Sequence, residues 1–203
     1  MKTLRYTLLT DGSSDAALKP ILDWLIASHR PDLGIIGEVA RGVGNVGLSL
    51  ERRVPAALQL YPCDLLFVHR DAEGEDPTVR AAEIDHAVGA LHANCVHVIP
   101  VRMTEAWLLS DEEAIRSAAE NKNGRAPLNL PNRRSWEALN DPKRTLFEAL
   151  VTASEKSGRA LAKFRPERQR AFVTLRTAEF TKLRGLSSFD TLERALTKFL
   201  KNF

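Results

Sequence analysis

Residues 65–76 of the chain are Leu65-Leu66-Phe67-Val68-His69-Arg70-Asp71-Ala72-Glu73-Gly74-Glu75-Asp76, an apolar segment followed by a polar, acidic one. The apolar run Leu65 to Val68 is typical of a buried strand. It leads into Asp71 and Glu73, two carboxylates separated by one residue. In an open α/β sheet, ligands bind outside the carboxyl ends of the strands. The stretch therefore predicts a central strand with acidic residues at the functional edge of a sheet.

Two acids in this i, i+2 arrangement can serve one divalent cation. Mg²⁺ takes oxygen ligands, commonly one or two carboxylates together with water and substrate phosphate. A simpler interpretation is also open, because Asp76-Pro77 is a common helix entry and the stretch then forms a solvated acidic loop before a helix. This motif alone leaves both interpretations standing.

Strand and helix patterns alternate along the first half of the chain. Strand patterns cover 5–10, 34–41, 65–68 and 95–101, and helical patterns follow the first three of them at 14–29, 48–58 and 77–92. This alternation predicts an α/β fold with a mostly parallel sheet and helices on both faces. The later patterns are helical or loop-like. We therefore expect an α/β core over 1–110 and a helical lobe over 111–203, packed together as a single compact unit.

The composition is that of an ordinary globular protein, with 44% hydrophobic and 27% charged residues among 203. No apolar run approaches the roughly 18 residues of a transmembrane helix, and the first residues do not resemble a signal peptide. Cys63 and Cys95 lack the spacing of a zinc site and are most simply buried hydrophobes in a reducing compartment. We therefore expect a cytoplasmic protein that does not enter membranes.

Charge is unevenly distributed along the chain. Residues 1–110 carry 10 Lys and Arg against 14 Asp and Glu, whereas residues 111–203 carry 19 against 12. An acidic half joined to a basic half fits a metal site beside a polyanion-binding surface, so we expect nucleic acid to bind the basic C-terminal lobe. Two lobes that simply attract each other would show the same asymmetry.

Two further acids occupy equivalent positions in the strand–helix pattern. Asp11 follows the first strand and Glu105 follows the fourth. Because the carboxyl ends of parallel strands meet at one edge, we expect Asp11, Asp71, Glu73 and Glu105 to converge there. Each has a simple structural alternative, since Asp11 suits a turn and Glu105 suits the first turn of a helix.

The segment Gly42-Val43-Gly44-Asn45-Val46-Gly47 matches the G-x-G-x-x-G dinucleotide fingerprint between a strand and a helix. That fingerprint normally opens the first βαβ unit, whereas a complete strand and helix precede it here. We therefore expect a structural turn, and a dinucleotide site is the alternative.

These motifs together resemble a known family. The acid-Gly turn and the acid-x-acid resemble the Toprim fold of topoisomerases, primases and overcoming-lysogenization-defect nucleases. More closely, the chain resembles a Toprim-related bacterial family catalogued as a domain of unknown function, whose members are often linked to mobile-element or phage-defence neighbourhoods. This resemblance spans most of the chain. It rests on Asp11-Gly12-Ser13-Ser14-Asp15, Arg70-Asp71-Ala72-Glu73, Glu105-Ala106-Trp107-Leu108-Leu109-Ser110-Asp111, Asp141-Pro142-Lys143 and Ser187-Ser188-Phe189.

The resemblance implies a nuclease, or a related phosphoryl-transfer enzyme acting on nucleic acid, that depends on Mg²⁺ or Mn²⁺ and acts in mobile-element or phage defence. Asp71 and Glu73 would hold the metal. Asp11 would be a further ligand or a general base for the attacking water. Glu105 would complete a second metal position or orient the residues that hold the first metal, and Lys143 would offset charge on the phosphate. A partner protein encoded nearby is a further expectation.

Two residues depart from the Toprim pattern. The pattern has Glu before the first Gly, where this chain has Asp11, and Asp-x-Asp, where this chain has Glu73 as the second acid. Both changes keep the charge but alter the reach of the carboxylate by about 1 Å, and Mg²⁺ demands near-octahedral geometry. The alternative function is therefore a catalytically degenerate Toprim-like module that binds nucleic acid or a protein.

Overall fold

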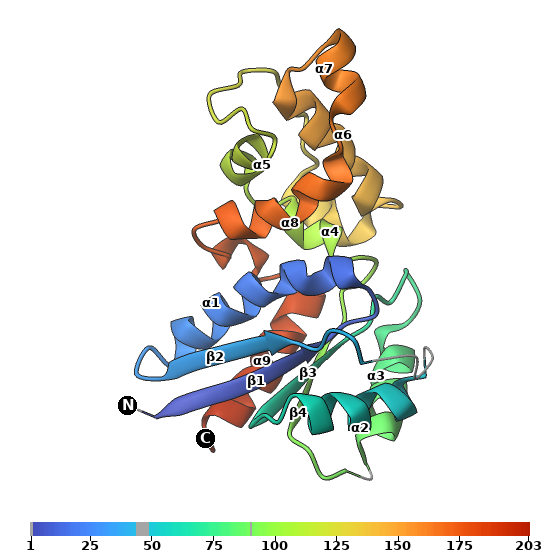
Figure 1. Ribbon diagram of the computed structural model, residues 1–203, viewed down its shortest axis with the longest axis vertical. Helices are drawn as coiled ribbons and strands as arrows, with labels where there is room; N and C mark the ends of the chain where they lie inside the picture. The colour runs from blue at the N-terminus through green and yellow to red at the C-terminus, as the bar shows by residue number, and fades with distance from the viewer. Residues whose placement is uncertain (1, 44–48, 90) are drawn as a thin grey trace.

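The computed structural model describes residues 2–43, 49–89 and 91–203, and its centre is a four-stranded sheet (Figure 1). The strands are β1 (Thr3–Leu9), β2 (Gly34–Val39), β3 (Leu65–His69) and β4 (Cys95–Val98), in the order β2-β1-β3-β4. Every neighbouring pair is parallel. The predicted α/β fold with a parallel sheet is therefore confirmed.

Helices cover both faces of this sheet, as alternation along β3 requires. Leu65 and Phe67 join a core with α1 (Lys19–His29) and α9 (Ser187–Leu200), whereas Leu66 and Val68 join a second core. The second core contains residues of α2 and α3, which are Leu50–Leu60 and Pro77–Gly89. Because successive side chains of a strand point to opposite faces, a fully apolar strand such as β3 needs both layers.

The described residues after β4 contain helices and turns but no strand. Figure 1 shows α5 to α8 above the sheet, while α9 passes behind the strands and ends close to the start of β1. Residues of α9 therefore share one apolar core with β1, β3 and β4. The helical segments are α4 (Glu105–Leu108), α5 (Glu112–Ala118), η2 (Arg133–Ala138), α6 (Pro142–Ser154), α7 (Gly158–Lys163), α8 (Pro166–Arg176) and η3 (Thr181–Leu183), with η1 (Ser13–Leu18) before α1.

The first helix differs in detail from the expected one. The chain leaves β1 through the short 3-10 helix η1 before α1 begins at Lys19, with Pro20 in the first turn of α1. Proline lacks an N–H and suits the first turn, so the α-helix begins later than its apolar spacing indicates. The consequence for function is that Asp15 lies on a tight turn beside the end of β1.

The structure also bears on membrane-spanning helices and on the two cysteines. None of the described helices has the length and apolar character needed to cross a membrane. Cys63 and Cys95 are free thiols and partly buried. Burial raises the pKa of both thiols, that of Cys95 to about 12. These cysteines therefore behave as small hydrophobes rather than as reactive groups.

Candidate functional site

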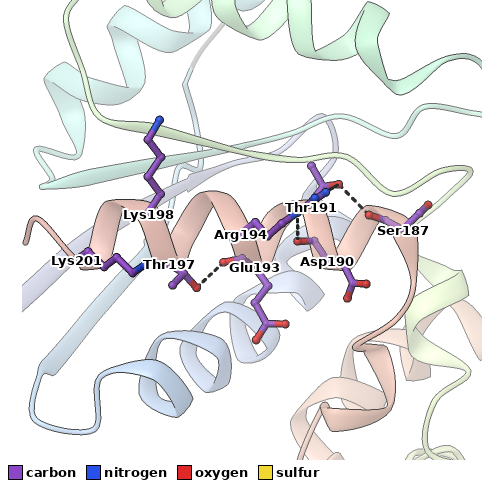
Figure 2. Close-up of a pocket in the computed structure, with 8 residues that line it drawn as sticks. All are labelled: Ser187, Asp190, Thr191, Glu193, Arg194, Thr197, Lys198 and Lys201. Carbon is purple, nitrogen blue, oxygen red and sulfur yellow. Dashed lines mark hydrogen bonds between the residues drawn. The ribbon is translucent and has the colours of Figure 1, made fainter.

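A hollow of about 750 Å³ runs along α9, and its lining residues all belong to that helix or to Lys201 directly after it (Figure 2). Its acids are already engaged, since Glu193 pairs with Arg184 at 2.9 Å and Asp190 accepts a hydrogen bond from the Gly185 backbone. A single helix surface cannot enclose a ligand, whereas small-molecule sites are usually concave and bury most of what they bind. The hollow is therefore a furrow on the surface of α9.

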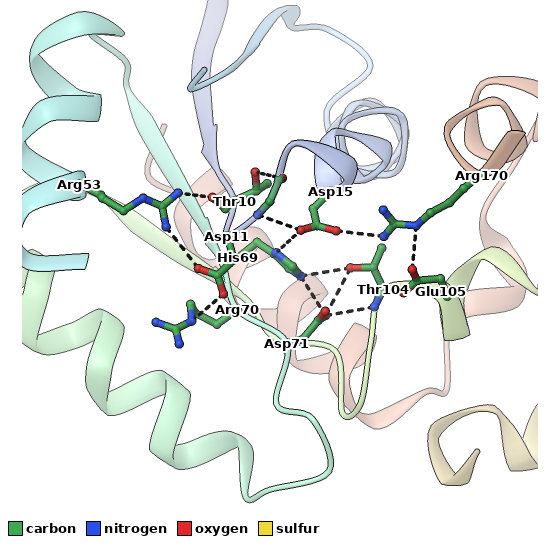
Figure 3. A network of polar contacts seen from close by, with 11 residues as sticks. Thr10, Asp11, Asp15, Arg53, His69, Arg70, Asp71, Thr104, Glu105 and Arg170 are labelled. Carbon is green, nitrogen blue, oxygen red and sulfur yellow. Dashed lines mark hydrogen bonds and ion pairs between the residues drawn. The ribbon is translucent and has the colours of Figure 1, made fainter. Parts of the chain in front are cut away.

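Charged residues gather instead where β1, β3 and β4 end, as Figure 3 shows. Asp11 and Asp71 each lie two residues beyond their strands, and Glu105 begins α4 shortly after β4. All three strands are parallel, so their carboxyl ends open onto the same edge. This edge is the candidate functional site.

Asp71 is fixed through one of its two oxygens. His69 Nε2 lies 3.1 Å from Asp71 Oδ1, and the Thr104 backbone N–H donates to the same oxygen at 3.1 Å. The Thr104 hydroxyl oxygen also lies 3.1 Å from His69 Nε2, and the His69 side chain is 1% exposed. Within the described part of the chain, Oδ2 of Asp71 has no ion pair or hydrogen bond. The carboxylate is thus oriented but still able to bind a ligand.

Glu105 is held by an arginine from a distant helix. Arg170, on α8, places Nε 3.0 Å from Glu105 Oε1 and donates from Nη2 to Asp15 Oδ1 at 2.9 Å. Glu105 and Arg170 are both almost fully buried. Burial raises the pKa of Glu105, as do the nearby charges of Asp71 and Asp15, while Arg170 acts in the opposite direction. Arg170 therefore ties the helical lobe to the acidic edge of the core.

Asp11 faces the α2 and α3 side of the same edge. Leu9 is level with Val68 in the sheet, which makes Asp11 level with Arg70. The Arg70 Nε lies 2.8 Å from Asp11 Oδ2, and Arg53 donates from Nη1 to Oδ1 at 3.3 Å. Both oxygens of Asp11 are thus engaged by guanidinium groups. As expected from strand alternation, Arg70 contacts this side while Asp71 contacts the other.

Two predicted site residues lie outside this network. Glu73 is exposed in the turn after β3, and its side chain makes no ion pair with the described residues. Lys143 is exposed in the first turn of α6, with Nζ 5.9 Å from the centre of the Phe147 ring. The structure links Asp71 to Glu105 because His69 Nδ1 lies 3.8 Å from Asp15 Oδ2, and Arg170 contacts both Asp15 and Glu105. Asp11 lies beside this network, and Glu73 and Lys143 lie apart from it.

Several residues of the network, Arg70 and Thr104 among them, were not predicted from the sequence as site residues. Asp15 and His69 stood within quoted motifs, and a buried histidine at a strand end is a usable signal. Arg53 and Arg170 carried no signal, because each sits in a helix among other basic residues and reaches a partner far along the chain. The partner of such an arginine can be identified only from the folded structure.

The balance of charge at the edge is close to neutral. Asp11, Asp15 and Glu105 pair with the guanidinium groups of Arg53, Arg70 and Arg170, whereas the fourth carboxylate, that of Asp71, lies beside His69. The sequence reasoning expected a divalent ion to hold the acids together, but arginine side chains supply most of that counter-charge. Among the described residues, no three His, Cys, Asp or Glu side chains form a ready-made metal cage.

The structural turn expected at Gly42 to Gly47 lies largely outside the described residues, which omit 44–48. Comparison of the chain with protein-family models, with curated proteins and with solved structures finds no match. Functional inference must therefore rest on the chemistry of the sheet edge.

Proposed function

We propose that this protein is a Toprim-like, divalent-metal-dependent phosphoryl-transfer enzyme, a nuclease that acts on nucleic acid, in the setting of mobile-element or phage defence. One observation carries the proposal: Asp71 and the buried Glu105 lie in one network at the carboxyl edge of a parallel sheet, joined through His69, Asp15 and Arg170. Among the described residues, no hydrogen bond or ion pair engages Oδ2 of Asp71. This is the edge at which such sheets bind their ligands.

The donor set fits a hard cation such as Mg²⁺ or Mn²⁺. Asp71 offers Oδ2, Glu105 has one oxygen outside its ion pair with Arg170, and Glu73 adds an exposed carboxylate on the adjoining turn. Mg²⁺ is commonly bound through one or two carboxylates, with waters and substrate phosphate completing the shell. When bound, such a metal polarises the scissile phosphate and stabilises the leaving oxygen.

The protein's own residues position these groups. His69 and Thr104 orient Asp71, and Arg170 keeps Glu105 and Asp15 in place. In this proposal Asp11 holds Arg53 and Arg70 at the edge, where preorganised guanidinium groups can face a phosphate without reorganising. Asp11 is also the candidate general base in this proposal, and its two oxygens contact the guanidinium groups of Arg53 and Arg70.

Nucleic acid would bind along the basic helical lobe. Arg168 and Arg176 are exposed on α8 and, within the part of the chain that the structure describes, form no ion pair. Arg170 on the same helix reaches the acidic edge, so α8 connects a solvent-facing basic surface to the site. Lys143 would contribute as a further phosphate contact on this lobe. Such binding weakens steeply with rising salt.

A second function, a non-catalytic module that binds nucleic acid or protein, is favoured by one observation. Arginines already engage both oxygens of Asp11 and one oxygen each of Asp15 and Glu105. In such a module the acids would serve as structural partners of Arg53, Arg70 and Arg170. Catalysis, and not nucleic-acid binding, separates the two functions.

The test is cleavage of labelled DNA and RNA, single- and double-stranded, with Mg²⁺, Mn²⁺ or chelator present. We expect metal-dependent cleavage that Asp71→Asn lowers by at least about a hundredfold, since even outer-shell losses at metal sites cost 10- to 100-fold. Asp85→Asn is the matched control, because Asp85 also lies 3.1 Å from a histidine Nε2 but sits on exposed α3. Salt-dependent binding without any cleavage would instead support the non-catalytic module.

A further inference from the structure

The turn after β3 has an unusual backbone. Glu73 and Gly74 have φ values of 54° and 86°, so two consecutive residues lie in the left-handed region. Their N–H groups donate to the carbonyl oxygens of Arg102 at 3.0 Å and Val101 at 2.9 Å, in the segment that follows β4. A non-glycine residue such as Glu73 adopts this conformation only when its surroundings hold it there. The turn is therefore clamped by the segment that contains Arg102.

The side chain of Arg102 lies against this same turn. A Cβ atom placed on Gly74 would come within 2.9 Å of Arg102 Nη1 and 3.0 Å of its Cζ. Gly74 is thus required both by its backbone conformation and by the guanidinium packed on it. This arrangement reserves a defined position for the guanidinium beside Glu73.

Arg102 differs from the other arginines at this edge of the sheet. Arg53, Arg70, Arg80 and Arg170 each pair with at least one carboxylate. In the described ranges, the Arg102 side chain has no ion pair and no hydrogen bond, although its Nε is buried. Buried donors are nearly always satisfied, and an exception indicates a catalytic role or an absent water or ion. Among the described residues, Arg102 is therefore a positioned cation without an ion-pair or hydrogen-bond partner.

We infer that Arg102 binds a phosphate group of the nucleic-acid substrate, which rests on the proposed function. The planar guanidinium offers parallel N–H donors that match two phosphate oxygens. Glu73 and Asp76 are exposed on the same turn and repel an anion, whereas Glu75 is already paired with Arg80. A divalent ion at the acids would offset this repulsion. Phosphate and Mg²⁺ therefore bind with positive coupling.

Isothermal titration of the full chain with inorganic phosphate, with and without Mg²⁺, tests the inference. Arg102→Gln should weaken phosphate binding by at least about tenfold, and Arg102→Lys by less, because lysine keeps the charge but loses the fork. Arg5→Gln is the matched control, since Arg5 is exposed near the opposite end of β1 and has no ion pair among the described residues. Its phosphate affinity should equal that of the wild type.

Two further readouts separate a binding role from a structural one. Bound Mg²⁺ should raise the melting temperature through Asp71, because only the folded state forms the site, and Arg102→Gln should keep this rise. Gly74→Ala keeps the arginine but crowds its guanidinium, and should weaken phosphate binding in the same direction. Phosphate binding that is absent from the wild type, or that stays within twofold of wild type in Arg102→Gln, overturns the inference.

The failure of this inference can be told from the failure of the proposed function. If the wild type responds to Mg²⁺ and cleaves nucleic acid but its phosphate affinity does not depend on Arg102, only the role of Arg102 in phosphate binding is overturned. If the wild type shows neither a metal response nor cleavage, but loses phosphate binding in Arg102→Gln, the nuclease function is overturned and phosphate binding by Arg102 is supported.

Discussion

Glu105 at the sheet edge and Glu137 beside α9 show two ways of enclosing a carboxylate. Glu105 faces one guanidinium, that of Arg170, whose Nε makes the 3.0 Å ion pair without hydrogen-bond geometry. Glu137 accepts four hydrogen bonds from the N–H and hydroxyl groups of Ser187 and Ser188, between 2.6 and 2.9 Å. Both acids join segments that are far apart in the sequence.

The two sites have opposite electrostatic outcomes. Burial dominates at Glu105 and raises its pKa. Burial acts in the same direction at Glu137, but the hydrogen bonds from Ser188 and Ser187 outweigh it and lower the pKa. Fixed neutral donors thus satisfy Glu137, which acts as a structural anchor for the start of α9. The edge around Glu105 is held by charges. Among the described residues, His69 Nδ1 makes no hydrogen bond there and lies 3.8 Å from Asp15 Oδ2.

The largest effect is expected from removing Arg170. Arg170→Met leaves Asp15 and Glu105 as buried carboxylates without their shared cation, and breaking a buried pair typically costs about 3–5 kcal/mol. Urea unfolding measures the loss. Arg144→Met is the control, because Arg144 pairs with Glu148 on an exposed helix face and should leave stability unchanged. If Arg170→Met and Arg144→Met changed the free energy of unfolding equally, the special role of buried charge pairs at the sheet edge would be contradicted.

Removing the Glu137 carboxylate should have a smaller effect. Glu137→Ala leaves four donors at the start of α9 to water, and losing a comparable cap costs about 1–2 kcal/mol. Ser188 then also loses part of the network in which it accepts a hydrogen bond from Trp107 Nε1 at 3.3 Å. Glu137→Gln should recover part of the loss. A Glu137→Ala protein as stable as wild type would contradict the anchoring role.

The two acids should also respond to pH in opposite directions. The folded pKa of Glu137 is lowered, so its stabilisation is present above the unfolded value of about 4.3 and is lost as pH falls through the folded pKa. The folded pKa of Glu105 is raised, so its contribution is present below that unfolded value and is lost as pH rises through the folded pKa. Denaturant unfolding of wild type, Glu137→Gln and Glu105→Gln between acidic and neutral pH measures both trends. Parallel trends in the two variants would contradict the assignment.

The smallest effect is expected at Lys143, which belongs to neither region. Lys143→Ala should leave stability within about 0.5 kcal/mol of wild type, as is usual for exposed positions. If Lys143 contacts a phosphate, the variant should lower the salt dependence of nucleic-acid binding by about one unit of slope. Filter binding at several salt concentrations measures it. A large loss of cleavage at unchanged binding would instead assign Lys143 a direct catalytic role.

The sequence predicted the sheet because the information was local. Apolar runs such as Leu65 to Val68, followed by helical spacing, specify a parallel strand with cover on both faces. Acids after those strands then had to emerge at one edge, which placed Asp71 and Glu105 correctly without any coordinates. Asp11 also emerged there, but on the side of α2 and α3.

What could not be predicted was the charge that keeps the acids together. Arg170 lies 155 residues from Asp15, and its helix shows the same basic pattern as a solvated face. The metal was therefore expected to balance the acids, a role that arginines largely fill. The sequence also did not reveal that α9 returns to the sheet, because an amphipathic helix does not show which surface it covers.

Titration of the protein with Mn²⁺ by isothermal calorimetry tests the central claim most directly, because it asks whether the acidic edge binds a divalent cation at all. We expect saturable binding by the wild type and by Asp85→Asn, and none by Asp71→Asn, which retains the fold but loses a ligand oxygen. Bound metal should also stabilise the folded state, by about 2.7 kcal/mol at a hundredfold excess over Kd. A wild type that binds no Mn²⁺ at millimolar concentration, or an Asp71→Asn protein that binds it equally well, would contradict the metal-dependent enzyme.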